Sequence, residues 1–423
     1  MMRDFINRKR KNYQKQEENN PFRKLEKGRN LIKESANEIF ANLKREIEES
    51  SLNYGFDNAK LKFVFMDDDL EISKNVKVYV DDGFEAPINE KGAGIQSVVI
   101  LELFSHYVKE KALSNSLLCI EEPEIYLHPH ACRAINNKLN DIATGNNNTQ
   151  IIITTHNPIF VKDYKVDGSR IFRVYKHSKE GTKANTVEID ENFKNILISD
   201  ENAEIFFAQK VIVTEGYEKF ILKFYNDLKE DSILDKHNIS ILSAGGKNNF
   251  STFIKLSKEL GIEIFILADF DYFLRGLLKD EETKNYLREK LGKKHYRYLE
   301  TLLNTSLTQV TYKEFRDNSK KLEDLDKIND DEKDKIREYI LEALENLKEK
   351  ANIYIIKGEI EDMFKQEYKD QILEKDEGRK KFKQNSIIKL RHFLVKENKD
   401  FPDIFKEELL TIMKDIIQKA VNE

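Results

Sequence analysis

The sequence predicts an α/β protein with a parallel sheet in each half of the chain. Short apolar runs alternate with stretches whose apolar residues recur at helical spacing, which is the pattern of parallel strands joined by crossover helices. In the second half, each apolar run also ends in a small or acidic residue. That pattern is typical of a sheet buried on both faces, with ligands at the carboxyl ends of its strands.

The composition limits the classes of protein that this chain can belong to. Its 423 residues suffice for two or three domains, and 35% charged residues with no tryptophan indicate a soluble, helix-rich protein. The net charge of -5 excludes a globally basic nucleic-acid binder but permits local basic grooves. Cys119 and Cys132 lack CxxC spacing, which favours a reduced, cytoplasmic protein. We expect no membrane segment, because no run approaches the roughly 20 apolar residues of a spanning helix.

The first half is predicted to hold two segments. Residues 1–50 form a helical segment, because apolar residues between Leu25 and Ile47 recur at helical spacing. Residues 51–197 form an α/β domain that begins with strands at "KLKFVFM" and "NVKVYV". The Gly-rich "NEKGAGIQS" leads into a helix, and the strand "SLLCIEE", a helix near "ACRAINNKLNDIA" and the strand "TQIIITTH" continue the parallel alternation.

The second half is predicted to hold a second α/β core over residues 205–275. Its strands are "QKVIVTEG", "HNISILSAGG" and "IEIFILADFD", with helices between them. Residues 276–350 carry alternating charges, which favour an exposed helical insertion. The strand "NIYIIKG" opens a final segment, residues 351–423, that completes the domain and ends in helices.

Two glutamates in the first half have the spacing of a nucleotide-hydrolysis site. Glu121 and Glu122 end a buried strand, where one carboxylate of such a site holds Mg²⁺ and the next orients the attacking water. An isolated pair is more often a plain turn, but His156 ends the neighbouring strand, where an imidazole could sense a γ-phosphate. The upstream Gly-rich segment can present backbone N–H groups and a helix N-terminus to an anion. Its residues are Gly92, Gly94, Gln96 and Ser97.

These three motifs in this order resemble a known ATPase class. GxGxQS, then hydrophobic-EEPExxLHP, then TTHNP is similar to the C-terminal half of ABC-type ATPases of the SMC kind. The similarity is greatest to the OLD (overcoming lysogenization defect) family of ATP-dependent endonucleases, Gabija-like nucleases among them. The resemblance makes residues 92–97 the signature motif, Glu121 and Glu122 the Walker B pair, and His156 the switch histidine.

The sequence departs from that class in one respect. It contains no GxxxxGK[ST] P-loop, and neither Gly246-Lys247 nor Gly292-Lys293 is followed by Ser or Thr. The domain over 51–197 is therefore a partial ABC-type ATPase, which we expect to bind ATP only with a complementing P-loop. Three explanations stay open: a separate subunit supplies the missing half, the gene is truncated or split, or the module has become structural.

Three acidic residues follow strands of the second core. Glu215 ends "VIVTEG", and Asp269 and Asp271 end "IFILADFD", a spacing that predicts both aspartates on one side of an extended strand end. The two aspartates alone would be an acidic rim. With Glu215 on a neighbouring strand, three converging carboxylates need a cation, and oxygen ligands suit Mg²⁺ or Mn²⁺.

The second core resembles the Toprim domain of topoisomerases, primases and OLD nucleases. "FFAQKVIVTEGYEKFIL", "SAGGKNNF" and "ILADFDYF" match the OLD version in order and spacing. The resemblance implies two-metal phosphodiester cleavage, with Asp269 and Asp271 as metal ligands and Glu215 as a ligand or general acid/base. The family carries a second glutamate four residues after the first; this chain has Lys219 there, so Glu218 is the candidate ligand.

Two later segments extend this resemblance. "IKGEIEDMF" resembles the family's late acidic segment, which makes Glu359, Glu361 and Asp362 candidates for a second metal; helix capping is an equal alternative. In "KKFKQNSIIKL" the resemblance implies a lysine that neutralises phosphate, and we assign it to Lys383.

The loop "SAGGKNNF" admits two interpretations, a plain turn or a phosphate-approaching loop. On the Toprim topology it follows the second strand, beside the carboxylates and before a helix N-terminus. Gly245 and Gly246 would let the backbone pass close to a metal or a DNA phosphate, and Lys247 adds a positive charge. The position therefore favours the second interpretation.

The leading hypothesis is a Mg²⁺- or Mn²⁺-dependent DNA endonuclease or nickase whose ATPase half regulates or assembles it. Family resemblance alone implies a role in anti-phage defence. The alternatives are another Toprim enzyme, primase-like or topoisomerase-like, and a regulatory subunit without chemistry of its own. We expect DNA as the substrate and a homodimer, since ATPases of this type work in pairs. A subunit that supplies the Walker A half, or a helicase-like protein, is a further expected partner.

Overall fold

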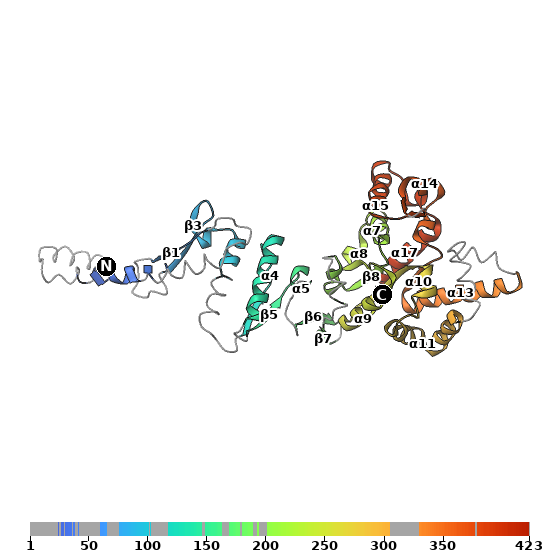
Figure 1. The fold of residues 1–423 in the computed structure, drawn as a ribbon, viewed down its shortest axis with the longest axis horizontal. Coiled ribbons are helices and arrows are strands. Elements are labelled where there is room, and N and C mark those ends of the chain that lie inside the picture. Colours follow the sequence, from blue (N-terminus) through green and yellow to red (C-terminus); the bar gives the residue numbers. More distant parts are fainter. Residues whose placement is uncertain are drawn as a thin grey trace. The chain divides into compact units, whose positions relative to one another are not determined.

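The chain forms two compact units, residues 1–167 and 168–423 (Figure 1). The computed structural model describes residues 24, 27–28, 30–35, 37–38, 41, 60–65, 76–100, 102, 117–145, 149–162, 169–177, 180–188, 193, 201–304, 330–376 and 379–422. The described residues before 42 are helical, in agreement with the predicted N-terminal helical segment, most of which lies outside the described residues. Each unit is considered by itself below.

An antiparallel sheet begins the first unit. Its strands, in the order β1-β2-β3, are β1 (Lys60–Phe65), β2 (Val76–Asp81) and β3 (Glu85–Pro87). We predicted that the first two belong to a parallel alternation, and this is wrong. Only residues 66–75 join them, and a parallel pair needs a crossover of a dozen or more residues. The short turn η2 (Ile88–Glu90) then leads to a helical stretch over residues 93–100.

A parallel strand pair with its crossover helix follows, as predicted. The elements are β4 (Leu117–Glu121), α4 (Pro129–Thr144), β5 (Gln150–Thr154) and α5 (Pro158–Lys162). Pro129 occupies the first turn of α4, where a missing N–H costs nothing. The apolar face of α4 packs Cys132, Ile135 and Leu139 against Leu118 of the sheet. Because the strands are parallel, Glu121 and Thr154 end side by side.

The second unit opens with an antiparallel hairpin, β6 (Arg170–His177) and β7 (Gly181–Glu188). We placed these residues in the first domain, which we extended to residue 197, but the hairpin belongs to the second unit. Arg173 shows why: its guanidinium donates hydrogen bonds to the carbonyl oxygens of Leu260 (3.1 Å) and Ala208 (2.9 Å). The turn η3 (Asn202–Phe206) follows it.

A four-stranded parallel sheet forms the centre of the second unit, as predicted. In the order β11-β10-β8-β9, its strands are β8 (Lys210–Thr214), β9 (Ile239–Ser243), β10 (Glu263–Asp269) and β11 (Ile353–Ile356). Val211, Ile212 and Phe265 are fully buried, so the continuous apolar runs are covered on both faces. The helices between the strands are α7 (Glu218–Lys229), α8 (Ile233–Lys236), α9 (Phe250–Leu260) and α10 (Phe270–Arg275).

The predicted helical insertion lies between β10 and β11. Its described helices are α11 (Glu281–Asn304), kinked at Gly292, and α13 (Asp330–Ala351). The two helices pack against each other (Figure 1). The Tyr286 hydroxyl donates to the carbonyl of Ala351 at 2.8 Å and so fixes α11 beside the start of β11.

The C-terminal segment wraps around the sheet. Its elements are η6 (Ile360–Met363), α14 (Gln366–Ile372), β12 (Glu374–Asp376), β13 (Arg379–Lys381), α15 (Gln384–Arg391), the π-helical turn η7 (His392–Lys396), α16 (Phe401–Ile404) and α17 (Glu407–Asn422). Phe364, Phe401 and Phe405 are fully buried in one core with Leu222 of α7. This packing explains why the segment after β11 completes the domain.

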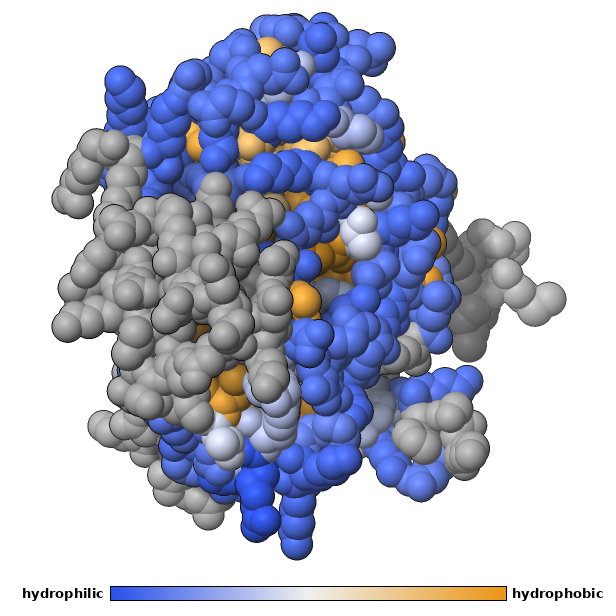
Figure 2. Space-filling view, turned by 90° about the vertical axis from the view of Figure 1, so that its right-hand side faces the viewer, coloured by the Kyte–Doolittle hydropathy of each residue, from blue (hydrophilic) through white to orange (hydrophobic). Residues whose placement is uncertain are grey.

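Most of the coloured surface in Figure 2 is hydrophilic, with apolar side chains in small areas between hydrophilic ones. Among the described helices, none combines the length and apolarity that crossing a bilayer requires.

Candidate metal centre

Acidic side chains gather at the carboxyl ends of three parallel strands in the second unit. Glu215 follows β8, Asp269 ends β10, and Glu359 and Glu361 follow β11. Burial raises the pKa of Asp269 well above its usual value, and the negative charges of Glu218, Glu215, Glu361 and Glu359 raise it further. These carboxylates therefore lie within electrostatic reach of one another, as the parallel topology predicted.

Glu218 begins helix α7 and turns its carboxylate back toward the strand end. Its Oε2 accepts the backbone N–H of Gly216 at 2.5 Å. Burial raises the pKa of Glu218 to about 7, and the charges of Glu215 and Glu361 add to this rise. A carboxyl group with this pKa can accept or release a proton near neutral pH.

The two aspartates of the DxD motif have different surroundings. We predicted both carboxylates on one side of an extended strand end, and this is wrong, because β10 ends at Asp269 and Asp271 lies in the first turn of α10. Phe270 and Phe273, three residues apart, are both buried, which is the spacing of one face of a helix. Asp271 is ion-paired with Lys247, and its Oδ1 lies 3.9 Å from Nε of Arg275.

The loop over residues 243–250 lies beside these carboxylates. The backbone N–H of Gly246 donates to the carbonyl of Glu215 at 2.9 Å, which ties the loop to the end of β8. Gly245 has φ 67° and Gly246 has φ 133°; both angles favour glycine, and the conformation of Gly246 is nearly restricted to it. Lys247 begins the turn η4 (Lys247–Asn249), and its charge opposes the rise that burial causes in the pKa of Glu215.

The segment after β11 caps a turn and also brings two glutamates near Asp269, while their role as metal ligands stays a prediction. The backbone N–H of Glu359 donates to Oδ2 of Asp362 at 3.4 Å, as part of a capping box for η6. Asp362 also pairs with Lys369, at 3.3 Å. Glu361 accepts the backbone N–H of Phe382 at 2.9 Å. Capping thus coexists with the placement of Glu359 and Glu361 near Asp269.

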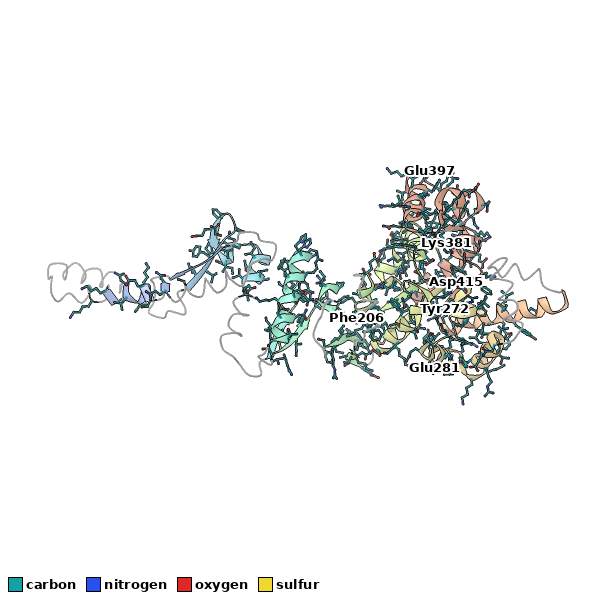
Figure 3. All side chains as sticks on the ribbon, in the orientation of Figure 1. Phe206, Tyr272, Glu281, Lys381, Glu397 and Asp415 are labelled. Atoms are coloured by element: carbon teal, nitrogen blue, oxygen red, sulfur yellow. The ribbon has the colours of Figure 1, made fainter. Side chains whose placement is uncertain are left out.

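A lysine that the sequence analysis did not select contacts the acidic cluster. Nζ of Lys381, labelled in Figure 3, lies 3.2 Å from Oε2 of Glu359 and 3.8 Å from Oε1 of Glu361. Burial lowers the pKa of Lys381, but the charges of Glu361, Glu359 and Asp269 outweigh burial and raise it. Lys383 instead pairs with Asp376 at 2.7 Å, and its role at the phosphate stays a prediction.

The sequence signal that separates these two lysines is weak. Lys381 ends β13, whereas Lys383 is the N-cap residue of α15. In "RKKFKQ" several basic residues are adjacent, and only the position where the strand ends determines which one faces the carboxylates.

The chemistry of the acidic residues fits a hard divalent cation. Burial, and after it mutual repulsion, raises the pKa values of Glu218 and Asp269, and oxygen donors of this kind are the ligands of Mg²⁺ and Mn²⁺. Within the described residues, no three acidic, histidine or cysteine side chains converge closely enough to coordinate a metal ion. The donor set is therefore present, without a preformed coordination shell.

The predicted ATPase residues meet in the first unit. Glu121 ends β4, and Glu122 follows with φ 41° and donates its N–H to the Thr154 carbonyl at 2.8 Å. Oε1 of Glu122 lies 3.6 Å from Nε2 of His156. Glu124 links the same two motifs, and this role was not predicted. Its Oε1 accepts the backbone N–H of His156 and the Thr155 hydroxyl, both at 2.7 Å.

The Gly-rich segment packs on the turn that follows these glutamates. A Cβ at Gly94 would lie 2.8 Å from the carbonyl oxygen of Tyr126, so only glycine permits this approach. Gln96 donates to the Lys91 carbonyl at 2.8 Å, and Ser97 donates to the Ala93 carbonyl at 3.1 Å. Both side chains thus support the local backbone, and anion binding by this segment, including Gly92, stays a prediction.

Comparison with known families agrees with both the ATPase-like residues of the first unit and the Toprim-like core of the second. Residues 1–161 match the family described as AAA ATPase domain, and residues 206–271 match the family described as overcoming lysogenization defect protein-like, TOPRIM domain. Residues 206–271 therefore resemble the Toprim domain of OLD proteins. The predicted order of the chain, an ATPase domain followed by a Toprim domain with a parallel sheet, is confirmed.

Three curated proteins are similar to this chain, and each is named as a nuclease. The "OLD nuclease" of Thermus scotoductus is 28% identical over 216 residues, which cover 49% of this chain and 40% of the relative. "Endonuclease GajA" of Bacillus cereus is 26% identical, with 79% of this chain and 52% of the relative covered. The "Old nuclease" of Escherichia phage P2 is 25% identical, with 78% and 58% covered. The chain spans about half the length of these relatives.

Proposed function

We propose that this chain contributes the cleavage site of a divalent-metal-dependent DNA endonuclease or nickase, as its resemblance to OLD nucleases suggests. The observation that carries the proposal is the cluster of carboxylates, centred on Asp269, at the carboxyl ends of β8, β10 and β11. Homology to three nucleases supports the reaction class. Carboxylates in this position serve phosphodiester hydrolysis with Mg²⁺ or Mn²⁺.

Each residue of the cluster has a role in this proposal. Glu215, Asp269 and Glu361 would hold the cation, which when bound polarises a phosphate oxygen and lowers the pKa of water. Glu218, with a pKa of about 7, can take up a proton at neutral pH. Lys381 balances the charge of the glutamates after β11, and Lys247 offers a positive charge to a DNA phosphate.

The ATPase unit has a regulatory role in the proposal. Glu122 and His156 meet at the ends of β4 and β5, as ATP hydrolysis needs, but the sequence printed above carries no P-loop lysine. ATP binding therefore depends on a complementing P-loop, and we propose a homodimer or a partner subunit as the assembly. Anti-phage defence is the role that the resemblance to Gabija-like nucleases suggests.

DNA cleavage by the purified chain tests the proposal. Supercoiled and linear DNA are incubated with Mg²⁺ or Mn²⁺, with and without ATP, alongside Asp269→Asn. We expect metal-dependent nicking or cutting that is lost in the variant. Asp231→Asn is the matched control, because Asp231 lies on an exposed turn with φ 52°, a conformation that asparagine tolerates.

Two results would contradict the proposal. Equal inertness of the wild type and Asp269→Asn with both metals would show that the chain does not cleave DNA by itself. Relaxed but covalently closed product would favour the topoisomerase-like alternative, since an endonuclease leaves open ends.

A further inference from the structure

Lys247 already neutralises one end of the acidic site. Its Nζ forms an ion pair with Asp271. Its charge and its backbone N–H also act on the carboxylate of Glu215. Arg275 adds a second positive group 3.9 Å from Asp271, on the neighbouring turn of α10. The carboxylate of Asp271 is thus already ion-paired with cationic side chains of the protein itself.

The Asp269 end of the site has the opposite balance of charge. Four glutamates act on Asp269, and the lysine that faces this cluster, Lys381, contacts Glu359 and Glu361. Coulomb attraction therefore draws a divalent cation to the Asp269 end first. A cation at the Asp271 end must compete with Lys247 for the same oxygen atoms.

The loop that carries Lys247 leaves open space beside its two glycines. Gly245 and Gly246 have positive φ, and a Cβ built at either one meets no heavy atom within 4 Å beyond its own residue and its two chain neighbours. The Lys247 side chain is 28% exposed, so a phosphate from solvent can reach it. A DNA phosphate offers Lys247 a partner in place of Asp271.

Resting on the proposed function, we propose that Lys247 is a displaceable competitor for a second divalent cation at Asp271 and Glu215. DNA phosphate releases Lys247 from Asp271, and the freed carboxylates then accept the second cation. Because such coupling is reciprocal, cation binding also raises the affinity of the site for DNA. The complete metal set therefore forms only with substrate in place, which limits cleavage activity in the absence of DNA.

Calorimetric titration with MnCl₂ tests the competition without any measurement of activity. We expect one tight binding event for the wild type and for Lys247→Arg, which keeps the charge. Lys247→Met should show a second event, or a weak event strengthened by roughly tenfold or more. Lys258→Met is the matched control, since Lys258 pairs with Glu289 at 3.1 Å on the surface of the helix after the same loop, and it should match the wild type.

A second titration tests the coupling. Fluorescence anisotropy follows binding of a phosphorothioate oligonucleotide, which resists hydrolysis, at increasing Mn²⁺. The cation should tighten oligonucleotide binding to the wild type and have little effect on Lys247→Met or Lys247→Gln, whose folding is checked by circular dichroism.

The outcomes separate this inference from the proposed function. Equal Mn²⁺ stoichiometry and affinity in the wild type and Lys247→Met would overturn the role of Lys247 and leave the nuclease untouched. Absence of Mn²⁺ binding in every variant would overturn the metal site itself, and the proposed function with it.

Discussion

Replacement of Glu218 by glutamine should stabilise the protein when divalent cations are removed, although it deletes a candidate ligand. Burial raises the pKa of Glu218 to about 7, and the charges of Glu215 and Glu361 contribute. Glutamine keeps an oxygen that can accept the N–H of Gly216, which now donates to Glu218 at 2.5 Å. The variant therefore removes the cost of burying a charge, together with the repulsion, and keeps the hydrogen bond.

The size of the effect follows from the pKa of Glu218. It rises from 4.5 to about 7, and each unit corresponds to about 1.4 kcal/mol of unfolding free energy. The full shift is equivalent to about 3 kcal/mol. Because the side chain is only half-buried, solvent screening lowers the expected gain to about 2 kcal/mol.

The gain must depend on pH with a defined sign. Below the unfolded pKa of 4.5, Glu218 is protonated in both states and costs nothing. As pH rises toward 7, the unfolded chain releases this proton first, so the unfolding free energy of the wild type falls. Above pH 7 the whole penalty is present, and the variant has its largest advantage.

Urea denaturation in EDTA, followed by circular dichroism at several pH values from acid to alkaline, measures this difference. Glu282→Gln, an exposed glutamate on α11, is the matched control and should leave stability unchanged. Added Mg²⁺ should stabilise the wild type more than Glu218→Gln, since the cation neutralises a carboxylate charge that the variant lacks. A difference that is constant with pH, or a variant less stable than the wild type in alkali, would refute the reasoning.

Three further predictions follow from the contacts in the two units. Lys381→Met should reduce DNA cleavage in the plasmid assay at least tenfold, because Lys381 contacts the carboxylates. A tenfold loss corresponds to roughly 1.4 kcal/mol of activation free energy. Lys383→Met should reduce cleavage less, and equal losses would contradict this reasoning. Gly246→Asn should lower the unfolding free energy by about 1–3 kcal/mol, because φ 133° and ψ 150° are nearly glycine-only, whereas Gly245→Asn at φ 67° should be tolerated; urea denaturation compares the two. Gly94→Ala should destabilise the first unit, seen as faster hydrogen exchange at the turn after Glu122, because its Cβ would clash with the carbonyl of Tyr126; unchanged exchange would show that the helix shifts freely.

The local sequence was sufficient to predict the central sheet. Strands β8 and β10 are continuous apolar runs, and a run of that kind is buried on both faces whichever residues lie around it. Glu215 and Asp269 follow these runs directly, so parallel strand direction alone brings them to one edge. The two adjacent glycines also indicated a tight turn before a helix, and both adopt positive φ in the structure.

Strand direction in short segments could not be predicted in this way. The alternation in "KLKFVFM" and "NVKVYV" suits either direction, and the short connection makes β1 and β2 antiparallel. The hairpin β6–β7 likewise belongs to the second unit, since Arg173 finds its acceptors at Leu260 and Ala208, far along the chain.

By itself, the sequence determined the class of fold and the acidic residues at the strand ends, because these depend on local apolar runs and on the residues that directly follow them. The tertiary structure decided which charges meet. It placed Lys381 rather than Lys383 at Glu359, and it paired Asp271 with Lys247 and left Asp269 among glutamates. The physical reason is that electrostatic partners are chosen by distance in space, and segments remote in sequence converge only when the sheet has formed.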